Sequence, residues 1–393
     1  MAIVKLEISD FRNLKAVEIA PAQGLNWVVG PNGSGKTSLL EALHLLATGK
    51  SFRANNLRSC IRGGAKTCRV VCLKNAAAYP DVIQRLGVER DLSGGVRAVL
   101  DQLEVTKLSG LANQIAVCTL LPDSINLLIG DPSLRREFLG WSMFHVEHNS
   151  DYLQVLRDYR FSLQQRNALL RRLNGSELPL SGNEAIRSKE LDGWDRQLGK
   201  FALKLDERRS HFMTLFRERY FSLISKEQLN LRSSSYSSNE VHFELLRGWP
   251  DGVSLEDALA EARMRDIERG FTGSGPHRAD IRISYAGKPV RDYFSRGQLK
   301  HLISICVLVQ ADLIRSSRGK DGLVFIFDDA FAELDENHAS SVLAALRSIS
   351  VQTFVTTSDA AVANRHVDAI QDRMFHVEHG DVQMSVSIPK ENY

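Results

Sequence analysis

The sequence predicts an α/β protein in which a phosphate-binding head is split by an inserted, mainly helical lobe. Three observations indicate this architecture: a phosphate-loop motif between an apolar run and a helical pattern, strand signals toward both ends of the chain, and a long polar helical stretch between them. We therefore expect an N-terminal half of the head at residues 1–128, a helical arm at residues 129–270 and a C-terminal half of the head at residues 271–393.

The N-terminal half alternates short strand signals with one helix. The apolar run at residues 25–29 is typical of a buried strand, and the leucines from Leu39 to Leu46 follow helical spacing. The motif between them therefore lies in the strand, loop, helix context of a phosphate loop. The strands expected in this half cover residues 3–8, 16–19, 25–29, 69–73 and 82–88.

Residues 30–38, GPNGSGKTS, fill every fixed position of the nucleotide-phosphate loop G-x-x-x-x-G-K-[ST]. Its glycines let backbone N–H groups fold around phosphate oxygens, and the following helix points its positive end at them. We expect Lys36 to reach the β and γ phosphates of ATP or GTP and Thr37 to bind Mg²⁺. The alternative is a glycine-rich turn without function, which the intact motif disfavours. The candidate nucleotide-binding residues are Gly30, Pro31, Asn32, Gly33, Ser34, Gly35, Lys36, Thr37 and Ser38.

Residues 131–269 have the character of long polar helices. Apolar residues recur at spacings of three and four from Leu153 to Leu170 and again from Leu198 to Phe216. The stretch at residues 174–183 is rich in Gly, Ser and Pro and is typical of a loop. We expect two antiparallel helices with a solvated outer face.

Basic residues slightly exceed acidic ones in this arm, with 14 Lys and Arg against 10 Asp and Glu at residues 151–220. Arginine pairs could contact nucleic-acid phosphates, although a solvated helix face is the commoner explanation of such pairs. A base-reading module is not recognisable in the sequence. The pairs are Arg135 and Arg136, Arg171 and Arg172, and Arg208 and Arg209.

The C-terminal half returns to strands and helices, with strands expected at residues 281–285, 323–327 and 353–356 and helices from about Ser295 and at residues 337–349. Residues 324–329, VFIFDD, form an apolar run that ends in two carboxylates, and such a strand lies beside the phosphate loop in P-loop proteins. Asp328 is then placed to bind Mg²⁺ and Asp329 to polarise the attacking water. The alternative is a buried strand that simply leaves into an acidic turn.

The composition favours a globular protein of two or three domains, with 393 residues, 43% of them hydrophobic, and a net charge of +3. This charge is too small to indicate a nucleic-acid-coating protein, so any such surface must be local. The five scattered cysteines lack a C-x-x-C pair, which argues against a disulfide framework and a structural zinc site. A secretory h-region is not recognisable, and the longest apolar stretch, residues 302–308, is far shorter than the ~18 residues of a membrane span. We therefore expect a cytoplasmic protein without a membrane partner.

The order of these motifs resembles the ABC-type ATPases of chromosome maintenance. The phosphate loop is followed by a helical insertion, then by FSRGQLK at residues 294–300, then by the acidic strand and AELD at residues 332–335. In that class the signature serine and glycine of one subunit reach the γ-phosphate bound by the other, so that nucleotide joins two heads. The resemblance implies an ATP-dependent homodimer. A plain helix N-cap is the alternative for Ser295 taken alone. The implied signature, acting in trans, is Ser295, Arg296, Gly297 and Gln298.

Further motifs in the chain follow one family order: DFRN at 10–13, SFR at 51–53, Pro122 and Asp123, RREFL at 135–139, QRNAL at 165–169, GPHRAD at 275–280, and FDDAFAELD at 327–335. Together with the phosphate loop they span almost the whole chain, and they resemble the RecF family of bacterial recombination mediators. The resemblance implies a DNA-repair ATPase that binds single- and double-stranded DNA, prefers junctions or gaps, and cooperates with RecR, in a pathway with RecO, to help load RecA in gap repair and the SOS response. It also places Arg12 and Asn13 among the nucleotide-binding residues.

The chain departs from the wider ABC pattern at several site positions. Arg296 stands where the usual signature has a second glycine, and Asp329 stands where glutamate is common, so its shorter reach favours slow hydrolysis. Ser358 and Asp359 occupy the place of the usual switch histidine, which leaves the sensor of the γ-phosphate unassigned. A glutamine-loop motif is not legible, although family position puts Pro122 and Asp123 near that edge of the site.

Other phosphate-loop proteins fit the chain less well. An SMC- or Rad50-like chromosome tether shares the head motifs, but an insertion of about 140 residues without a C-x-x-C hook cannot form its very long coiled coil. A transporter subunit gives no reason for GPHRAD or for the insertion. A small-molecule kinase does not need Ser295 to Gln298.

Overall fold

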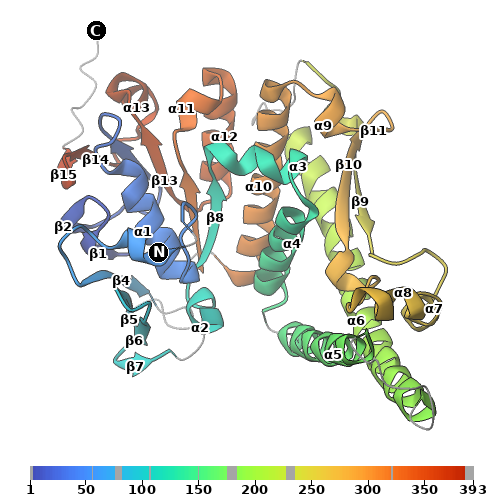
Figure 1. The fold of residues 1–393 in the computed structure, drawn as a ribbon. Coiled ribbons are helices and arrows are strands. Elements are labelled where there is room, and N and C mark those ends of the chain that lie inside the picture. The colour runs from blue at the N-terminus through green and yellow to red at the C-terminus, as the bar shows by residue number, and fades with distance from the viewer. Residues whose placement is uncertain are drawn as a thin grey trace. The chain divides into compact units, whose positions relative to one another are not determined.

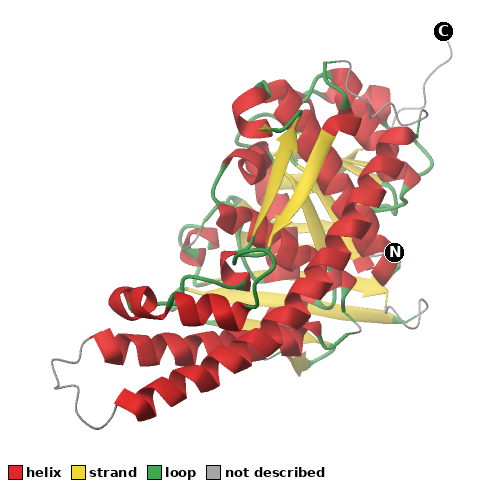
Figure 2. Ribbon diagram, turned by 90° about the vertical axis from the view of Figure 1, so that its right-hand side faces the viewer, coloured by secondary structure: helices red, strands yellow, loops and turns green. Residues whose placement is uncertain are grey.

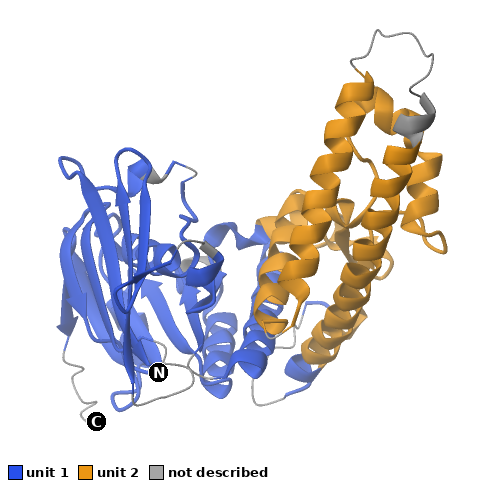
Figure 3. Ribbon diagram, turned by 90° about the horizontal axis from the view of Figure 1, so that it is seen from below, with its two compact units in different colours: residues 1–125, 222–236, 295–393 blue, residues 126–221, 237–294 orange. Residues whose placement is uncertain are grey.

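The structure is a computed structural model that describes residues 3–54, 56–75, 82–105, 108–148, 150–174, 184–226, 235–319 and 322–385. The chain forms two compact units (Figure 3), each made of segments that are distant in sequence. Unit 1 contains Met1–Ile125, Ser222–Tyr236 and Ser295–Tyr393, and unit 2 contains Asn126–Phe221 and Ser237–Phe294. The predicted limits of the arm, residues 129 and 270, were drawn from sequence character and stay a prediction.

A six-stranded sheet forms the centre of unit 1, in the order β15-β14-β3-β13-β12-β8. Every neighbouring pair is parallel except β14 with β15. Three of the four interior strands, β3, β12 and β13, are buried at every residue, as expected of a parallel sheet covered on both faces. Their carboxyl ends therefore meet at one edge, where ligands bind in open α/β sheets. The strands are β3 (Leu25–Val29), β8 (Ala116–Leu120), β12 (Leu323–Phe327), β13 (Gln352–Thr357), β14 (Arg373–Glu378) and β15 (Asp381–Ser385).

A second, antiparallel sheet of unit 1 has the order β2-β1-β4-β5-β6-β7. Helix α1 (Lys36–Thr48) packs against β1, β4 and β5 of this sheet and also against β8 and β13 of the parallel sheet. Ten of its 13 residues are buried, which explains why it is apolar on more than one face. The strands are β1 (Lys5–Phe11), β2 (Leu14–Ile19), β4 (Thr67–Asn75), β5 (Ile83–Asp91), β6 (Val96–Leu100) and β7 (Leu103–Glu104).

Helix α10 (Arg296–Arg318) packs against β8, β12 and helix α12 (Glu336–Ser348), and Figure 1 shows it across β8 from α1. It is long and apolar enough to cross a membrane by length and composition, yet 83% of that window is buried in the fold, as in the core helix of a globular protein. The shorter elements of unit 1 are η1 (Leu57–Cys60), α2 (Leu108–Ala112), η2 (Pro122–Ile125), α11 (Ala330–Glu333) and α13 (Ala360–His366).

Unit 2 is mainly helical, with a small antiparallel sheet in the order β11-β10-β9 (Figure 2). Its two long helices are α5 (Tyr152–Asn174) and α6 (Glu184–Ser225), the last turn of which belongs to unit 1. The predicted loop at residues 174–183 lies almost wholly outside the described residues. The other elements are α3 (Asn126–Ile129), α4 (Pro132–Val146), η4 (Ser238–Glu240), β9 (Val241–Leu246), α7 (Leu255–Glu261), α8 (Arg263–Arg269), η5 (Pro276–Arg278), β10 (Asp280–Tyr285), β11 (Lys288–Pro289) and α9 (Val290–Tyr293).

A buried charge network joins α5, α6 and α8 within unit 2. Arg166, which is 0% exposed, donates through Nε to Asp195 at 2.6 Å and through Nη1 to Asp266 at 2.8 Å and Thr272 at 2.9 Å. Arg263 donates a second bond to Asp195 at 3.0 Å. Two buried carboxylates are thus compensated mainly by one arginine, and removing that arginine leaves them without their cation.

Other family-specific motifs in unit 2 have structural roles as well. Arg135 donates to both carboxylate oxygens of Asp280, and Arg136 donates to the carbonyl of Ala279. Arg208 and Arg209 are likewise engaged, the first with Glu147, Ser150 and Asp151 and the second with the carbonyl of Pro276. These two arginine pairs brace the unit through contacts within it, and the possibility that they contact nucleic-acid phosphates stays a prediction.

The predicted α/β class is confirmed, and the predicted strand at residues 25–29 coincides with β3 and that at 323–327 with β12. The strands β6 to β9, β11, β14 and β15 were not predicted. Several of them are two to six residues long and alternate weakly, so their position is decided by pairing partners far away in sequence rather than by local pattern.

Replacing Arg166 with alanine should lower the free energy of unfolding of unit 2 by about 3–5 kcal/mol, because it strands two buried carboxylates. Urea unfolding of the full chain, followed by tryptophan fluorescence, measures this change. Arg171→Ala on the exposed face of the same helix is the matched control and should be nearly neutral. Equal stability of the two variants would contradict the assigned role of Arg166.

Candidate nucleotide-binding and catalytic site

The phosphate loop connects β3 to α1 and adopts the conformation that its glycines permit. Gly33 and Gly35 have φ values of 79° and 124°, which side chains with a Cβ rarely adopt. At Gly30 the constraint is space, because a Cβ atom there would lie 2.1 Å from the carbonyl oxygen of Val377. The three glycines are therefore needed for the backbone path itself.

Lys36 is folded over this loop. Its Nζ donates to the carbonyl oxygens of Gly30 at 2.7 Å and Pro31 at 3.0 Å, and the residue is 8% exposed. Burial lowers the pKa of Lys36, and the charges of Asp329 and Asp328 oppose that shift. The ammonium group is thus held at the loop, next to both acidic residues of the candidate site.

Asp328 lies at the carboxyl end of β12 and is 7% exposed. Its carboxylate accepts hydrogen bonds from the hydroxyls of Thr356 at 2.6 Å and Thr37 at 3.2 and 3.3 Å. Both donors are uncharged hydroxyls, so these hydrogen bonds do not neutralise the negative charge of the buried carboxylate, and a bound cation could do so. A hydroxyl beside a carboxylate is the oxygen donor set that Mg²⁺ takes in phosphate-loop sites, and the two residues that would hold the ion fit the group.

Asp329 follows directly and begins helix α11. Its backbone is in the left-handed region, with φ 52°, and its N–H donates to the Thr356 hydroxyl at 2.7 Å. Thr356 therefore fixes both acidic residues, one through the carboxylate and one through the backbone. Sequence reasoning missed this threonine, although a hydroxyl near the end of the buried strand FVTT is the signal that could have found it.

Asn13 braces the phosphate loop from the β1–β2 turn. Its Nδ2 donates to the carbonyls of Ser34 at 2.9 Å and Gly33 at 3.3 Å, and its Oδ1 accepts from the Ser38 hydroxyl at 2.9 Å. From the other side, the N–H of Gly380 donates to the Ser34 carbonyl at 2.9 Å. The loop is therefore held on two sides before any ligand is bound.

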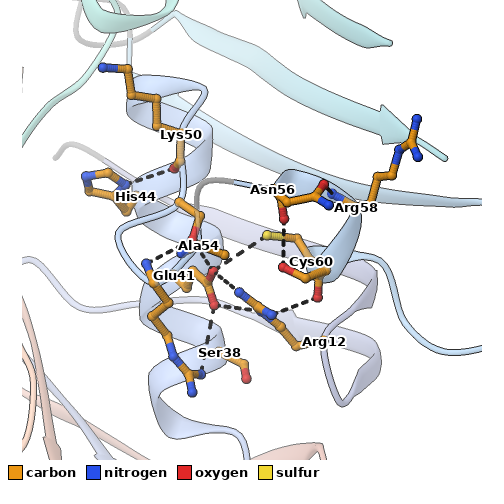
Figure 4. Close-up of polar contacts among 12 residues, drawn as sticks. Arg12, Ser38, Glu41, His44, Lys50, Ala54, Asn56, Arg58 and Cys60 are labelled. Atoms are coloured by element: carbon orange, nitrogen blue, oxygen red, sulfur yellow. Dashed lines mark hydrogen bonds and ion pairs between the residues drawn. The ribbon is translucent and has the colours of Figure 1, made fainter. Parts of the chain in front are cut away.

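Arg12 lies beside Asn13 but faces a buried carboxylate (Figure 4). Its Nε and Nη2 donate to the two oxygens of Glu41, at 2.9 and 2.7 Å, and Nη1 donates to the Ser59 carbonyl at 2.7 Å. Burial raises the pKa of Glu41, but the hydrogen bonds from Arg12 and Ser51 outweigh burial and hold it below its usual value. Glu41 was not predicted, because a single glutamate inside an apolar helix has no motif of its own.

The Ser51 hydroxyl joins the SFR motif to the same carboxylate. It donates to Glu41 and accepts from the backbone N–H groups of Arg53 and Ala54, each at 2.9 Å. The Arg53 guanidinium lies 4.0 Å from Glu41, with half of its side chain exposed. The DFRN and SFR motifs thus meet on helix α1, one turn beyond the phosphate loop.

The candidate signature turn begins helix α10. Ser295 and Gln298 form a capping box, with the Ser295 N–H donating to Gln298 Oε1 at 2.8 Å, and Gln298 Nε2 donates to the Ser235 carbonyl at 3.2 Å. The residues Ser295, Arg296 and Gly297 are exposed. In the described part of the chain their hydrogen bonds do not join those of the phosphate loop.

The structure also places four further residues that the sequence analysis singled out. Pro122 lines a small pocket with Lys300, Asp328 and Leu334, so the segment after β8 does lie at the acidic edge, whereas Asp123 is exposed. Asp359 caps helix α13 by accepting from the N–H groups of Ala361 and Val362. Ser358 is exposed.

Comparisons with known proteins agree with this geometry. Residues 2–383 match the family described as the RecF/RecN/SMC N terminal domain. The DNA replication and repair protein RecF of Stenotrophomonas maltophilia is 35% identical over 99% of this chain and 100% of its own length. That of Pseudoalteromonas translucida is 33% identical over 97% and 99%.

Solved structures show the same fold at lower identity. A recombination mediator protein, RecF with ATP, superposes with a TM-score of 0.81 at 21% identity and covers 98% of this chain and 97% of its own. The Smc head domain of Pyrococcus furiosus gives a TM-score of 0.55 at 17% identity, over 98% and 95%. The predicted ABC-type head with a helical insertion is therefore confirmed.

The variant Asn13→Ala removes three hydrogen bonds that hold the loop in shape. At about 0.5–1.5 kcal/mol for each bond, we expect ATP affinity to fall by at least about tenfold. Calorimetric titration with a non-hydrolysable ATP analogue measures the loss. Lys15→Ala, exposed on the same hairpin, should bind as the wild type does, and an unchanged affinity of Asn13→Ala would contradict the bracing role.

Proposed function

The chain belongs to the RecF family, and we propose that it is an ATP-dependent DNA-binding protein of recombinational repair and replication-fork maintenance. In this proposal it dimerises when ATP and Mg²⁺ bind and holds DNA at junctions or gaps between single and double strands. It then acts with RecR, in a pathway with RecO, to help load RecA during the SOS response. The cytoplasm, where the bacterial DNA lies, is the compartment we propose for it.

The observation that carries this proposal is the division of the site. Lys36, Thr37, Asp328 and Asp329 come together around the phosphate loop, while the turn at Ser295 is exposed and takes no part in their network. The capping box uses the N–H of Gln298, whereas the N–H groups of the first two residues of a helix have no acceptor within it. The exposed turn at Arg296 and Gly297 can therefore donate to an anion that another copy presents. A nucleotide bound at the loop would then be enclosed by two copies.

Slow hydrolysis fits the same residues. In this proposal Asp329 polarises the attacking water, and its side chain is one methylene shorter than the glutamate common in related ATPases. Its backbone is fixed by Thr356, which limits how far the carboxylate can move toward a γ-phosphate. We expect ATP to serve mainly as the bond between two copies and hydrolysis to release it.

A chromosome tether of the SMC or Rad50 kind is the second candidate. The longest helix of the described residues, α6, has 42 residues and therefore extends about 63 Å. The better superposition with RecF than with the Smc head also disfavours a tether. We therefore keep the DNA-repair proposal.

The variant Lys36→Arg tests the role of the nucleotide. The guanidinium is bulkier than the ammonium group that bonds Gly30 and Pro31, so we expect ATP-dependent dimerisation and ATP-dependent DNA affinity to be lost. Gel filtration with ATP and with ADP, at equal protein concentration, measures the dimer. Wild-type behaviour of Lys36→Arg would refute the proposal.

Ser295→Arg separates nucleotide binding from dimerisation. The site is exposed, so the fold should tolerate the change, and the phosphate loop is untouched. We expect ATP affinity within about twofold of wild type and loss of the dimer, because a bulky side chain blocks the turn that would face the partner's phosphates. Gln298→Glu in the same capping box is a useful companion, since it adds a negative charge near the proposed γ-phosphate. A full ATP-dependent dimer of Ser295→Arg would reject the trans role.

A further inference from the structure

Unit 2 has an open groove between α5 and α6 whose walls are aromatic. Phe161 from α5 and Trp194 and Phe201 from α6 line it, and its volume is about 570 Å³. Figure 2 shows the two helices running together along the unit. The rings of Phe161 and Trp194 meet edge to face, with centroids 6.3 Å apart. This groove is far in sequence from every residue of the nucleotide site.

Phe161 is not a core residue, because 57% of its surface is exposed. The core of this region lies beneath it and consists of Leu169, Leu170 and Leu191 with Leu173, Trp194 and Ile267 packed against them. A large aromatic side chain left in water next to a second ring is a feature of binding surfaces.

The rim of the groove is basic. On α6, Arg196, Lys200 and Lys204 are exposed at spacings of four and therefore follow one another along the helix surface, and Lys200 Nζ lies 5.9 Å from the centroid of the Phe201 ring. On α5, Arg157 is exposed four residues before Phe161 and therefore lies on the adjoining part of the helix surface. In the described part of the chain, these four side chains form no ion pair with a carboxylate within 4.0 Å, and Arg196 donates to the Asp192 carbonyl at 3.3 Å.

Acidic side chains also line the groove, at Asp158 and Glu190, together with Lys189. Asp158 accepts a hydrogen bond from Gln154 at 2.8 Å and is half-buried. The net charge of the side chains that line and surround the groove is positive. Aromatic faces next to exposed Lys and Arg side chains suit a ligand that carries both flat rings and phosphates.

We propose that this groove binds single-stranded DNA, with one or two bases stacked on Phe161 and Trp194 and the backbone phosphates held by Arg157, Arg196 and Lys200. The inference rests on the proposed function, to which it adds a place for the unpaired strand of a junction or gap. Stacking of bases on aromatic rings within a basic surface is the general mode of sequence-independent single-strand binding. A duplex keeps its bases stacked inside and cannot use the rings.

Gly193 offers a way to close the groove without harming the fold. It lines the groove, and a Cβ atom built on it meets no other atom within 4 Å. A side chain at this helical position would enter the groove, and replacing an interior helix glycine stabilises rather than weakens the helix. Gly193→Glu therefore fills the groove and adds a charge that repels phosphate, while Gly193→Ala is its matched control.

The test is binding of a labelled oligothymidylate of about 12 nucleotides, measured by fluorescence anisotropy on the full chain without ATP. We expect Phe161→Ala to weaken binding about tenfold, as the loss of one stacked base implies. Gly193→Glu should weaken it at least as much, and Gly193→Ala and Leu203→Ala, exposed on α6 outside the groove, should not change it. Arg196→Gln and Lys200→Gln should each lower the slope of log affinity against log salt by about 0.7.

Two readouts distinguish this inference from the proposed function. Oligothymidylate should quench the fluorescence of the wild type and much less that of Trp194→Phe, while Lys36→Arg should keep this binding although it loses the ATP-dependent dimer. Unchanged affinity in both Phe161→Ala and Gly193→Glu would overturn the inference and leave the groove to a protein partner. Loss in the Arg196 and Lys200 variants alone would also overturn it, because it would show phosphate contacts without stacking.

Discussion

The candidate site depends on one buried carboxylate. Asp328 ends β12, receives hydroxyls from Thr356 on the neighbouring β13 and from Thr37 on α1, and so joins three elements at the edge where the phosphate loop begins. The hydrogen bonds to this buried carboxylate come from neutral hydroxyls, and a carboxylate beside a hydroxyl suits a bound Mg²⁺. A magnesium ion bound together with a nucleotide would add positive charge next to Asp328 at this edge of the sheet. Lys36 lies close enough for its positive charge to interact with Asp328, although its ammonium group donates its hydrogen bonds to the carbonyls of the loop.

The phosphate loop itself is preorganised by residues that do not need to touch a ligand. Asn13 and Gly380 donate hydrogen bonds to carbonyl oxygens of the loop and so fix its backbone from that side. Further along helix α1, the Glu41 carboxylate accepts hydrogen bonds from Arg12 and Ser51. Arg12 was expected to bind nucleotide, and that assignment stays a prediction. Its two bonds to Glu41 indicate that any influence on the nucleotide in this conformation passes through the position of the loop.

The head could be predicted well from the sequence, because its signals are local. A phosphate loop needs glycines at fixed offsets, and the buried strands 25–29 and 323–327 are short apolar runs bounded by turns, so pattern and structure agree there. Thr356, Glu41 and the glycine at 380 could not be found in this way. Each acquires its role from a partner that lies between 10 and about 350 residues away, and nothing in the neighbouring sequence marks it.

The arm shows the opposite case, in which specific motifs were visible but their physical role was not. The arginine pairs of the arm could be interpreted as phosphate contacts, yet Arg135 donates to a carboxylate and Arg209 to a carbonyl inside unit 2. Arg166 of QRNAL likewise donates to two buried carboxylates. Composition cannot separate a bracing arginine from a binding one, since both are basic residues on amphipathic helices. The separation comes from burial and from partners. The basic residues that remain exposed on α5 and α6 include Arg157, Arg196, Lys200 and Lys204, which lie near the groove that the exposed ring of Phe161 lines. This combination of basic and aromatic side chains is what suits the groove, in our proposal, to single-stranded DNA.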